Sequence, residues 1–179
     1  MKGGESLTTE EFENLLEVHG NDIYRFCVYI MQNRENAEDL YQDTVLTAFR
    51  KADDIVLTEN PKSYLLSVAV KLSHNFFRKE KRKNEKLISP APEIMDNIPN
   101  DTDLQASAED SALKTALKKA VSELKEKYRV PIVLYYYGEH DIASISAIMK
   151  LPQGTVKSRL HKARELLAEK LKKEGFDNE

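Results

Sequence analysis

Apolar residues recur at intervals of three or four along most of this chain, which is the spacing of one face of an α-helix. The clearest stripe lies near the C-terminal end and consists of Val156, Leu160, Ala163, Leu167 and Leu171. The two-residue alternation of a half-buried strand is absent. We therefore predict an all-α protein, with helices at about residues 9–32, from 36 onward, 61–82, 108–127, 128–137, 141–149 and 152–173.

The periodicity is interrupted over residues 87–110. This segment holds three of the six prolines, six acidic residues and no Lys or Arg. Because proline lacks a backbone donor and does not fit a helix interior, we interpret the segment as an extended acidic linker. It divides the chain into two small helical domains, an N-terminal one over residues 1–86 and a C-terminal one over residues 111–179.

The formal net charge of the 179 residues is −3, which by itself argues against a nucleic-acid-binding protein. The charges are segregated, however. Residues 1–49 carry 3 basic and 10 acidic side chains, whereas residues 50–86 carry 10 basic and 5 acidic ones. Residues 111–179 carry 14 basic and 9 acidic side chains. This segregation predicts partners of opposite charge for different parts of the chain.

Several classes of protein do not fit the sequence. No stretch approaches the roughly 20 apolar residues that cross a bilayer, and the first nine residues lack an apolar signal core. A lone cysteine, Cys27, excludes an internal disulfide and most zinc–cysteine sites. The four histidines lack metal-ligand spacing, and no phosphate-binding glycine loop is present. We expect a cytoplasmic protein without membrane insertion, enzymatic activity, catalytic residues, metal, cofactor or small-molecule substrate.

The helix that starts near Asn36 has two unlike faces. On a helical wheel, Ala37, Tyr41, Val45 and Ala48 share the apolar face, and the opposite arc carries Asp39, Gln42, Asp43 and Leu46. An ordinary solvated acidic face is one interpretation. An apolar Leu46 surrounded by carboxylates also suits docking on a basic protein surface.

The helix over residues 61–82 combines cations with an aromatic ring. Its far side carries Tyr64, Lys71, His74, Arg78 and Arg82, a combination that suits single-stranded nucleic acid, since bases stack on rings while cations hold phosphates. A basic, solvated helix end is the alternative. A second apolar stripe, formed by Leu66, Val70 and Phe77, is expected to pack on the first helix.

The last two helices have the pattern of a helix-turn-helix. A short helix over residues 141–149 is followed by the turn Lys150-Leu151-Pro152 and a long helix. In this motif the second helix enters the major groove of DNA with its N-terminal residues toward the bases. An ordinary helical hairpin is the alternative. The exposed face of the long helix carries Lys157, Ser158, His161 and Lys162, with Arg159 and Arg164 flanking the buried stripe.

Three segments together resemble the extracytoplasmic-function (ECF) group of bacterial sigma factors, within the sigma-70 family. LPQGTVKSRLHKARELL (residues 151–167) is similar to the family's recognition helix. NAEDLYQDTVLTAFRKADD (residues 36–54) is similar to its A-E-D-L-x-Q-[DE]-T-[FV] helix, and PKSYLLSVAVKLSHNFFRKEKR (residues 61–82) is a looser match. Their order and spacing also agree with the family.

The resemblance implies an alternative sigma factor that binds core RNA polymerase, through its clamp helices and flap, and directs initiation at promoters with −35 and −10 elements. Asp39, Gln42, Asp43 and Leu46 would bind the polymerase. The helix over residues 61–82 and the loop over residues 53–60 would open the −10 region. An anti-sigma factor is a further implied partner. The implied DNA contacts are Tyr64, Lys71, His74, Asn75, Arg78 and Arg82 for single-stranded −10 DNA, and Lys157, Ser158, Arg159, His161, Lys162 and Arg164 for duplex −35 DNA.

The sequence departs from the family pattern at Lys71, where Asn is usual, and at Lys150, where the turn usually has Gly. Ser144 and Ser146 replace the usual Glu and Ala of the positioning helix. A stand-alone helix-turn-helix regulator is the alternative function. It would leave the acidic face around Leu46 without a role.

Overall fold

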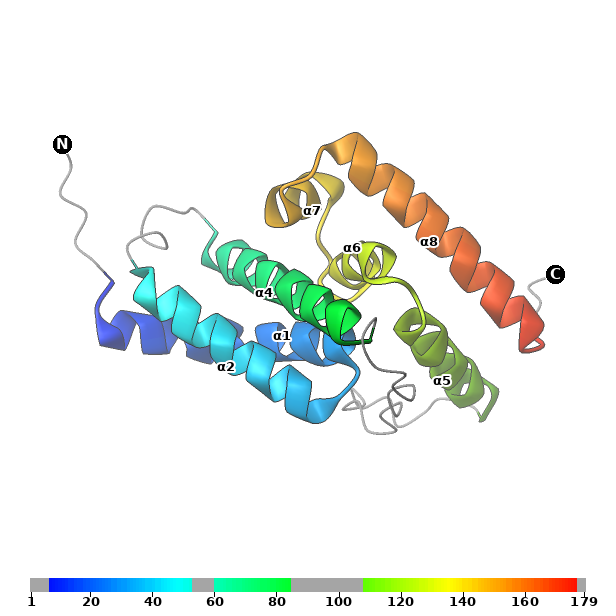
Figure 1. Ribbon diagram of the computed structural model, residues 1–179, viewed down its shortest axis with the longest axis horizontal. Coiled ribbons are helices and arrows are strands. Elements are labelled where there is room, and N and C mark those ends of the chain that lie inside the picture. The colour runs from blue at the N-terminus through cyan, green and yellow to red at the C-terminus, as the bar shows by residue number, and fades with distance from the viewer. Residues whose placement is uncertain (1–6, 53–59, 85–107, 177–179) are drawn as a thin grey trace.

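The computed structural model describes residues 7–52, 60–84 and 108–176. No strand is present in these three segments, so the predicted all-α class is confirmed. The predicted loop over residues 53–60 and the linker over residues 87–110 lie largely outside them. The helices are α1 (Thr9–Met31), α2 (Arg34–Arg50), α4 (Pro61–Asn84), α5 (Ala108–Ser122), α6 (Glu126–Tyr136), α7 (Ile142–Met149) and α8 (Gln153–Lys173) (Figure 1).

Helix α1 begins with a capping box. The Thr8 hydroxyl accepts a hydrogen bond from the Glu11 amide, and the Glu11 carboxylate accepts one from the Thr8 amide. The helix runs unbroken through the buried Gly20, although a glycine at that place could have interrupted it. A Cβ atom there would lie 2.8 Å from the Tyr41 hydroxyl, so Gly20 allows α2 to pack closely on α1.

Helices α1, α2 and α4 form the N-terminal domain (Figure 1). On α2, Ala37 and Ala48 are fully buried as predicted, but Tyr41 and Val45 are only half-buried. Leu40 and Thr44 take the central positions instead, because α2 packs against both α1 and α4 and therefore buries a wider arc. The buried Thr44 hydroxyl donates to the Leu40 carbonyl oxygen, which satisfies its hydrogen-bonding potential.

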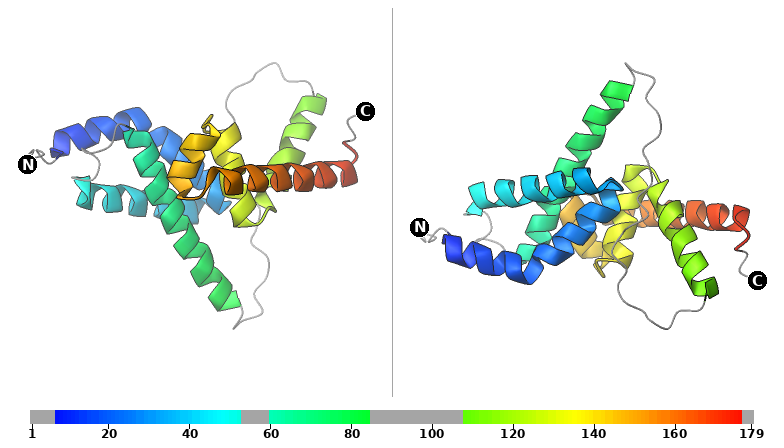
Figure 2. Two further views of the ribbon diagram at one scale, coloured as in Figure 1. Left: turned by 90° about the horizontal axis from the view of Figure 1, so that it is seen from above. Right: turned by 90° about the horizontal axis from the view of Figure 1, so that it is seen from below.

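Helices α5 to α8 form the C-terminal domain, with α6 in its interior. Four members of the predicted α8 stripe, Val156, Leu160, Ala163 and Leu167, are buried, and Leu171 is half-buried. Figure 2 shows that α8 projects away from the N-terminal domain and that the C-terminal end of α4 projects in another direction. None of the helices described here combines the length and the hydropathy of a membrane span.

The two domains lie in contact. Helices α6 and α7 pack against α4, and α6 also packs against α1. Leu66 of the second apolar stripe lines a cavity with Val133 and Leu134 of α6, and the Phe77 ring lies 5.2 Å from the Arg129 guanidinium. The expectation that this stripe packs on α1 was therefore incomplete, since at Leu66 and Phe77 it also meets the C-terminal domain.

Candidate nucleic-acid and protein interfaces

The acidic face of α2 is open to solvent. Asp39, Gln42 and Asp43 are exposed, and the exposed fraction of Leu46 is 50%. Phe49 lies three residues further along the helix and is 44% exposed, with its ring edge-on to Phe12. The sequence analysis missed Phe49, although its spacing from Leu46 is that of neighbours on one helix face. The face therefore presents two exposed apolar side chains beside two carboxylates.

The predicted face of α4 is only partly free. Lys71, Arg78 and Arg82 are exposed, whereas Tyr64 and Asn75 are half-buried. The Arg78 Nη2 atom donates to the Asn75 Oδ1 atom at 3.0 Å, which fixes the two side chains relative to each other. The structure thus brings five of the six predicted side chains to one side of α4.

His74 is the exception. Its Nδ1 atom lies against the Glu126 carboxylate at the start of α6, an ion pair when the imidazole is protonated. The two residues are far apart in the sequence, so no local pattern could predict this pairing. As a result, one of the six predicted −10 contacts faces the other domain.

The N-terminal half of α8 presents Lys157, Ser158, His161 and Lys162 to solvent, as predicted, and half-buries Arg159. Lys162 donates to Glu165 at 2.9 Å, and this contact raises the pKa of Lys162 and lowers that of Glu165. A competing anion such as a DNA phosphate can therefore replace Glu165 at this exposed ammonium group.

Arg164 is also exposed, but aromatic side chains of α6 orient it. Its Nε atom donates to the Tyr136 hydroxyl at 2.9 Å, and its guanidinium lies 5.2 Å from the Tyr135 ring centroid. The sequence analysis did not assign a role to either tyrosine. They hold the Arg164 side chain at the edge of the exposed face of α8.

Three departures from the family pattern, Lys150, Ser146 and Ser144, lie in or near the turn before α8. Lys150 has a φ angle of 52°, and the Leu151 amide donates to the Ser146 carbonyl oxygen at 3.0 Å, as in a Schellman motif. The Ser146 hydroxyl donates to the Leu151 carbonyl oxygen, which adds a second link across the turn. The Ser144 amide donates to Asp141, the N-cap of α7. The lysine therefore adopts the left-handed conformation that favours glycine, the usual residue at this turn.

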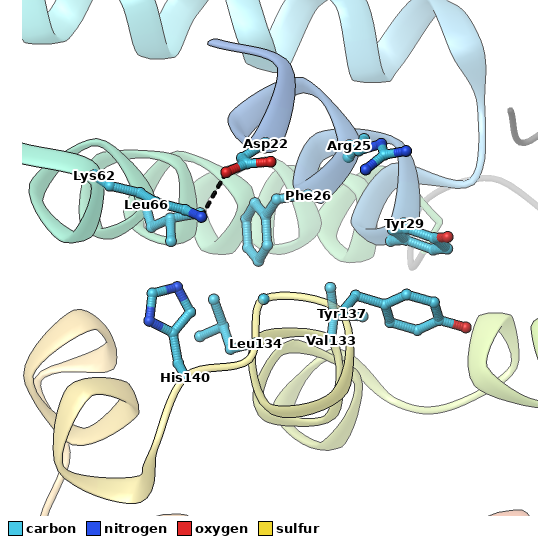
Figure 3. A pocket seen from close by; sticks show the side chains of 11 residues that line it. Asp22, Arg25, Phe26, Tyr29, Lys62, Leu66, Val133, Leu134, Tyr137 and His140 are labelled. Carbon is cyan, nitrogen blue, oxygen red and sulfur yellow. Dashed lines mark hydrogen bonds and ion pairs between the residues drawn. The ribbon is translucent and has the colours of Figure 1, made fainter. Parts of the chain in front are cut away.

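A small cavity of about 100 Å³ lies between the domains (Figure 3). Its walls include Phe26 and Leu66 from one domain and Leu134 from the other. At one end, Lys62 donates to Asp22 at 2.5 Å, and the His140 ring faces this pair. Burial, followed by the nearby Lys62 charge, lowers the pKa of His140.

Within the described segments, no cluster of three His, Cys, Asp or Glu side chains could hold a metal ion. Cys27 is fully buried, and this burial raises the pKa of its thiol to about 12. A packing role for Cys27 agrees with its place on the apolar face of α1.

The chain matches two protein-family models. Residues 15–83 match sigma-70 region 2, and residues 114–167 match sigma-70 region 4. The ECF RNA polymerase sigma factor SigW of Bacillus subtilis is 27% identical over 173 residues, covering 91% of this chain and 90% of SigW. SigM of the same organism, also an ECF RNA polymerase sigma factor, is 28% identical over 155 residues, covering 87% of this chain and 91% of SigM.

A solved structure is also similar. The sigma factor RpoE, in complex with the anti-sigma factor NepR from Bartonella quintana, superposes with a TM-score of 0.72 at 26% identity, covering 92% of this chain and 98% of RpoE. A match over 92% of this chain necessarily includes helices of both domains.

Proposed function

The chain belongs to the sigma-70 family, in its ECF group, and from this premise we propose how each surface takes part in transcription initiation. The protein is an alternative sigma factor that directs RNA polymerase to promoters. Sigma factors of this family are initiation factors without enzymatic activity of their own. We propose that this chain likewise performs no catalysis, uses no cofactor and acts in the cytoplasm.

The proposed division of labour follows the two family matches. Residues 1–86 form region 2, which binds core polymerase and the −10 element, and residues 111–179 form region 4, which binds the −35 element. Residues 87–110 connect them. One observation carries the proposal: an acidic face with exposed apolar side chains on α2 and basic faces on α4 and α8 all lie on exposed sides of their helices.

The polymerase-binding surface is the exposed face of α2. Leu46 and Phe49 would supply the apolar contacts at its centre, while Asp39, Gln42 and Asp43 would meet basic groups on the clamp helices of the polymerase. An exposed apolar pair surrounded by charge is typical of a protein-binding surface. The stand-alone regulator would have no use for this face.

The −10 surface is the exposed side of α4. Lys71, Arg78 and Arg82 would hold phosphates of the single strand, and Tyr64 would stack on a base. Extrusion of a base costs a few kcal/mol, and stacking returns roughly 1–3 kcal/mol. Because these two energies nearly cancel, strand opening would be completed only within the polymerase complex.

The −35 surface is the N-terminal half of α8, placed in the major groove. Ser158 and His161 are suited to base edges, and Lys157 and Lys162 can reach guanine or phosphate. Arg159 and Arg164 would contact the backbone on either side. Each neutralised phosphate would contribute about −0.9 to the slope of log K against log salt.

An anti-sigma factor is the third proposed partner. The similar RpoE was solved with the anti-sigma factor NepR bound. The acidic and apolar α2 face and the basic α4 and α8 faces of this chain are the surfaces that such a protein would cover to prevent initiation.

The polymerase contact is tested by pull-down with Bacillus subtilis core polymerase, because that organism supplies similar relatives. Asp43→Lys should weaken binding about tenfold, as expected for reversing a charge at a protein interface. Glu13→Lys, an equal charge change at an exposed position of α1, is the matched control. Equal binding of wild type and Asp43→Lys would disprove the assignment. Run-off transcription from a random promoter library then reads out both DNA elements.

A further inference from the structure

Arg164 of α8 is held by aromatic side chains and not by a carboxylate. Its Nε atom donates to the Tyr136 hydroxyl at 2.9 Å, and its guanidinium lies 5.2 Å and 5.6 Å from the ring centroids of Tyr135 and Tyr136. Lys162, by contrast, lies 2.9 Å from the Glu165 carboxylate. A phosphate must displace Glu165 to reach Lys162, whereas over the described segments no carboxylate competes for Arg164.

The Tyr136 hydroxyl group still has a proton to donate. A guanidinium carries five N–H donors and no acceptor, so the hydroxyl oxygen accepts the hydrogen bond from Arg164. A phenol oxygen that accepts one bond keeps its own O–H donor. The Nη1 and Nη2 atoms of Arg164 carry four further N–H groups. Donors from two residues therefore lie side by side, an arrangement suited to the oxygens of a phosphate.

The hydrophobic core fixes this pair in place. Tyr135 is half-buried and packs against the core, and its ring meets the Tyr136 ring edge-on at 5.0 Å. The same Tyr135 ring lies under the Arg164 guanidinium. Because the arginine is already held in one orientation, it loses less side-chain freedom when it binds an anion.

The stability of the fold does not account for the arrangement. Arg164 is exposed, and the exposed fraction of Tyr136 is 54%. Polar contacts between such exposed side chains contribute little to folding. Helices α6 and α8 already pack on each other, and both supply buried side chains to the core. A large exposed ring that orients an exposed arginine is better explained by contact with a partner.

Arg164 lies on a flank of α8, where the DNA backbone would pass. An α-helix with its side chains is about 10–12 Å wide, and the major groove is about 12 Å wide. The flanks of a helix in the groove therefore meet the phosphates on either side. Lys157, His161 and Arg164 follow one another at i, i+4 and i+7 along one edge of α8, and all three are exposed. Tyr136 reaches this edge from α6.

We propose that Tyr136 and Arg164 form a phosphate site for the DNA backbone beside the −35 element, in which the Tyr136 hydroxyl holds Arg164 Nε and donates its own proton to a phosphate oxygen. The proposal rests on the proposed position of α8 in the major groove. It makes Tyr136 a DNA-contacting residue that lies outside the helix-turn-helix. Because phosphate contacts carry no sequence information, the site fixes the position of α8 and does not select bases.

The duplex affinity of the full chain tests the role of the hydroxyl group. Gel-shift titrations use a −35 duplex from the promoter library and the same duplex with one base pair changed. Tyr136→Phe keeps the ring and removes the hydroxyl, so it should weaken binding to both duplexes about fivefold. Tyr137→Phe makes the same change at the next residue, whose ring stacks on Tyr29, and should leave the affinity unchanged. Equal affinity of Tyr136→Phe and wild type would overturn the proposal.

The two residues should also act together. Arg164→Ala should weaken binding about tenfold and reduce the slope of log K against log salt by about 0.9. Tyr136→Phe removes no charge and should leave this slope unchanged. In the Arg164→Ala background, Tyr136→Phe should weaken binding only about twofold, because the hydroxyl no longer has an arginine to hold. A fivefold loss in both backgrounds would show that Tyr136 does not position Arg164.

Replacement of single phosphates by neutral methylphosphonates locates the contact. With wild type, replacement of one phosphate beside the −35 element should weaken binding about tenfold. With Tyr136→Phe combined with Arg164→Ala, the same replacement should have almost no effect, whereas Tyr137→Phe should keep the wild-type profile. A purely structural role of Tyr136 and Arg164 would weaken binding equally at all positions, and that result would overturn the phosphate site.

Failure of the phosphate site and failure of the proposed function give different results. If wild type directs transcription and binds the −35 duplex, but Tyr136→Phe binds equally well, only the phosphate site is wrong. If wild type binds no duplex selectively, the proposed position of α8 in the major groove is wrong, and the phosphate site is refuted with it.

Discussion

Helices α4 and α8 each carry seven Lys and Arg side chains, yet the structure uses the two helices differently. Cations of α8 pair within their own domain, as Lys162 does with Glu165 and Lys170 with Glu123. On α4, Lys62 also pairs within its own domain, with Asp22 of α1, but His74, about three turns further along the helix, reaches Glu126 of the other domain. Helix α8 lies at the edge of its domain with one buried stripe, whereas α4 is packed on two sides.

The difference teaches where a DNA-binding surface can be regulated. A helix at the edge of a domain exposes its basic face whatever the other domain does. A helix between two domains exposes its complete face only after they separate. We therefore expect substitutions on α8 to act directly on DNA affinity, and those on α4 to act through both DNA contact and docking.

The largest effect is expected at Lys162. Lys162→Glu removes a cation from the face that we propose enters the major groove, and it places a second carboxylate beside Glu165. Loss of such a contact costs about 1–3 kcal/mol, and reversal adds repulsion, so binding to a −35 duplex should fall about 100-fold. Gel-shift titration with a duplex from the selected promoter library measures this affinity.

Two controls accompany this substitution. Lys173→Glu makes the same charge change at the far end of α8, about 30 Å helix length from its start, and should reduce affinity only slightly. Binding to core polymerase should be unchanged in both variants. Loss of polymerase and DNA binding together would mean that Lys162→Glu unfolds the domain. Equal DNA affinity of the two variants would contradict the proposed position of α8 in the major groove.

The next effect is expected at Tyr64 of α4. Tyr64→Ala removes the ring proposed to stack on an unpaired base, an interaction of roughly 1–3 kcal/mol. Open-complex formation should slow about tenfold, while closed-complex affinity stays constant. Fluorescence of 2-aminopurine in the −10 element follows strand opening. Tyr64→Phe keeps the ring, so open complexes should form at nearly the wild-type rate. A rate as slow as that of Tyr64→Ala would contradict the stacking role.

The same contrast shows what could be predicted from the sequence. The stripe of α8 and the polar face around Leu46 followed from helical periodicity, since each belongs to a single helix that buries one side. The second stripe of α4 was visible too, at Leu66 and Phe77, but its partner was not. Contacts such as His74 with Glu126 and Tyr29 with Tyr137 join residues that become neighbours only after both domains have folded and docked.

A smaller effect is expected in the turn that positions α8. Lys150 has a φ angle of 52°, a conformation that costs a residue with a side chain about 1–2 kcal/mol. Lys150→Gly removes this cost but adds roughly 0.5–1 kcal/mol of unfolded-state entropy. The net stabilisation should be about 0.5–1 kcal/mol, measured by thermal melting. Lys157→Gly, at an exposed position inside α8, should instead destabilise the protein by about 1 kcal/mol. If Lys150→Gly does not stabilise the protein, the turn is not strained.

The smallest effect concerns the pH dependence of the contact between the domains, which we expect to involve a group that faces α4 and none on α8. His140 faces Lys62 of α4, Asp22 and Arg25 of α1, and Asp141 beside it. Burial and then Lys62 lower its pKa in the docked form, whereas separation should return the pKa to its ordinary value near 6.5. Docking is therefore fully favoured above pH 6.5 and weakens as the pH falls below it, because the separated form binds the proton more readily.

Energy transfer between dyes on Glu17→Cys of α1 and Ala168→Cys of α8, both exposed positions, measures this response at pH 8 and pH 5.5, and His140→Gln should reduce it. The informative quantity is the difference between wild type and His140→Gln, because His74 and Glu126 also meet at this contact between the domains. His161→Gln on α8 is the matched control, since its imidazole lies far out in solvent with 77% of the side chain exposed. If His161→Gln alters the response and His140→Gln does not, proton-linked docking does not involve the cavity, and the contrast between α4 and α8 no longer holds.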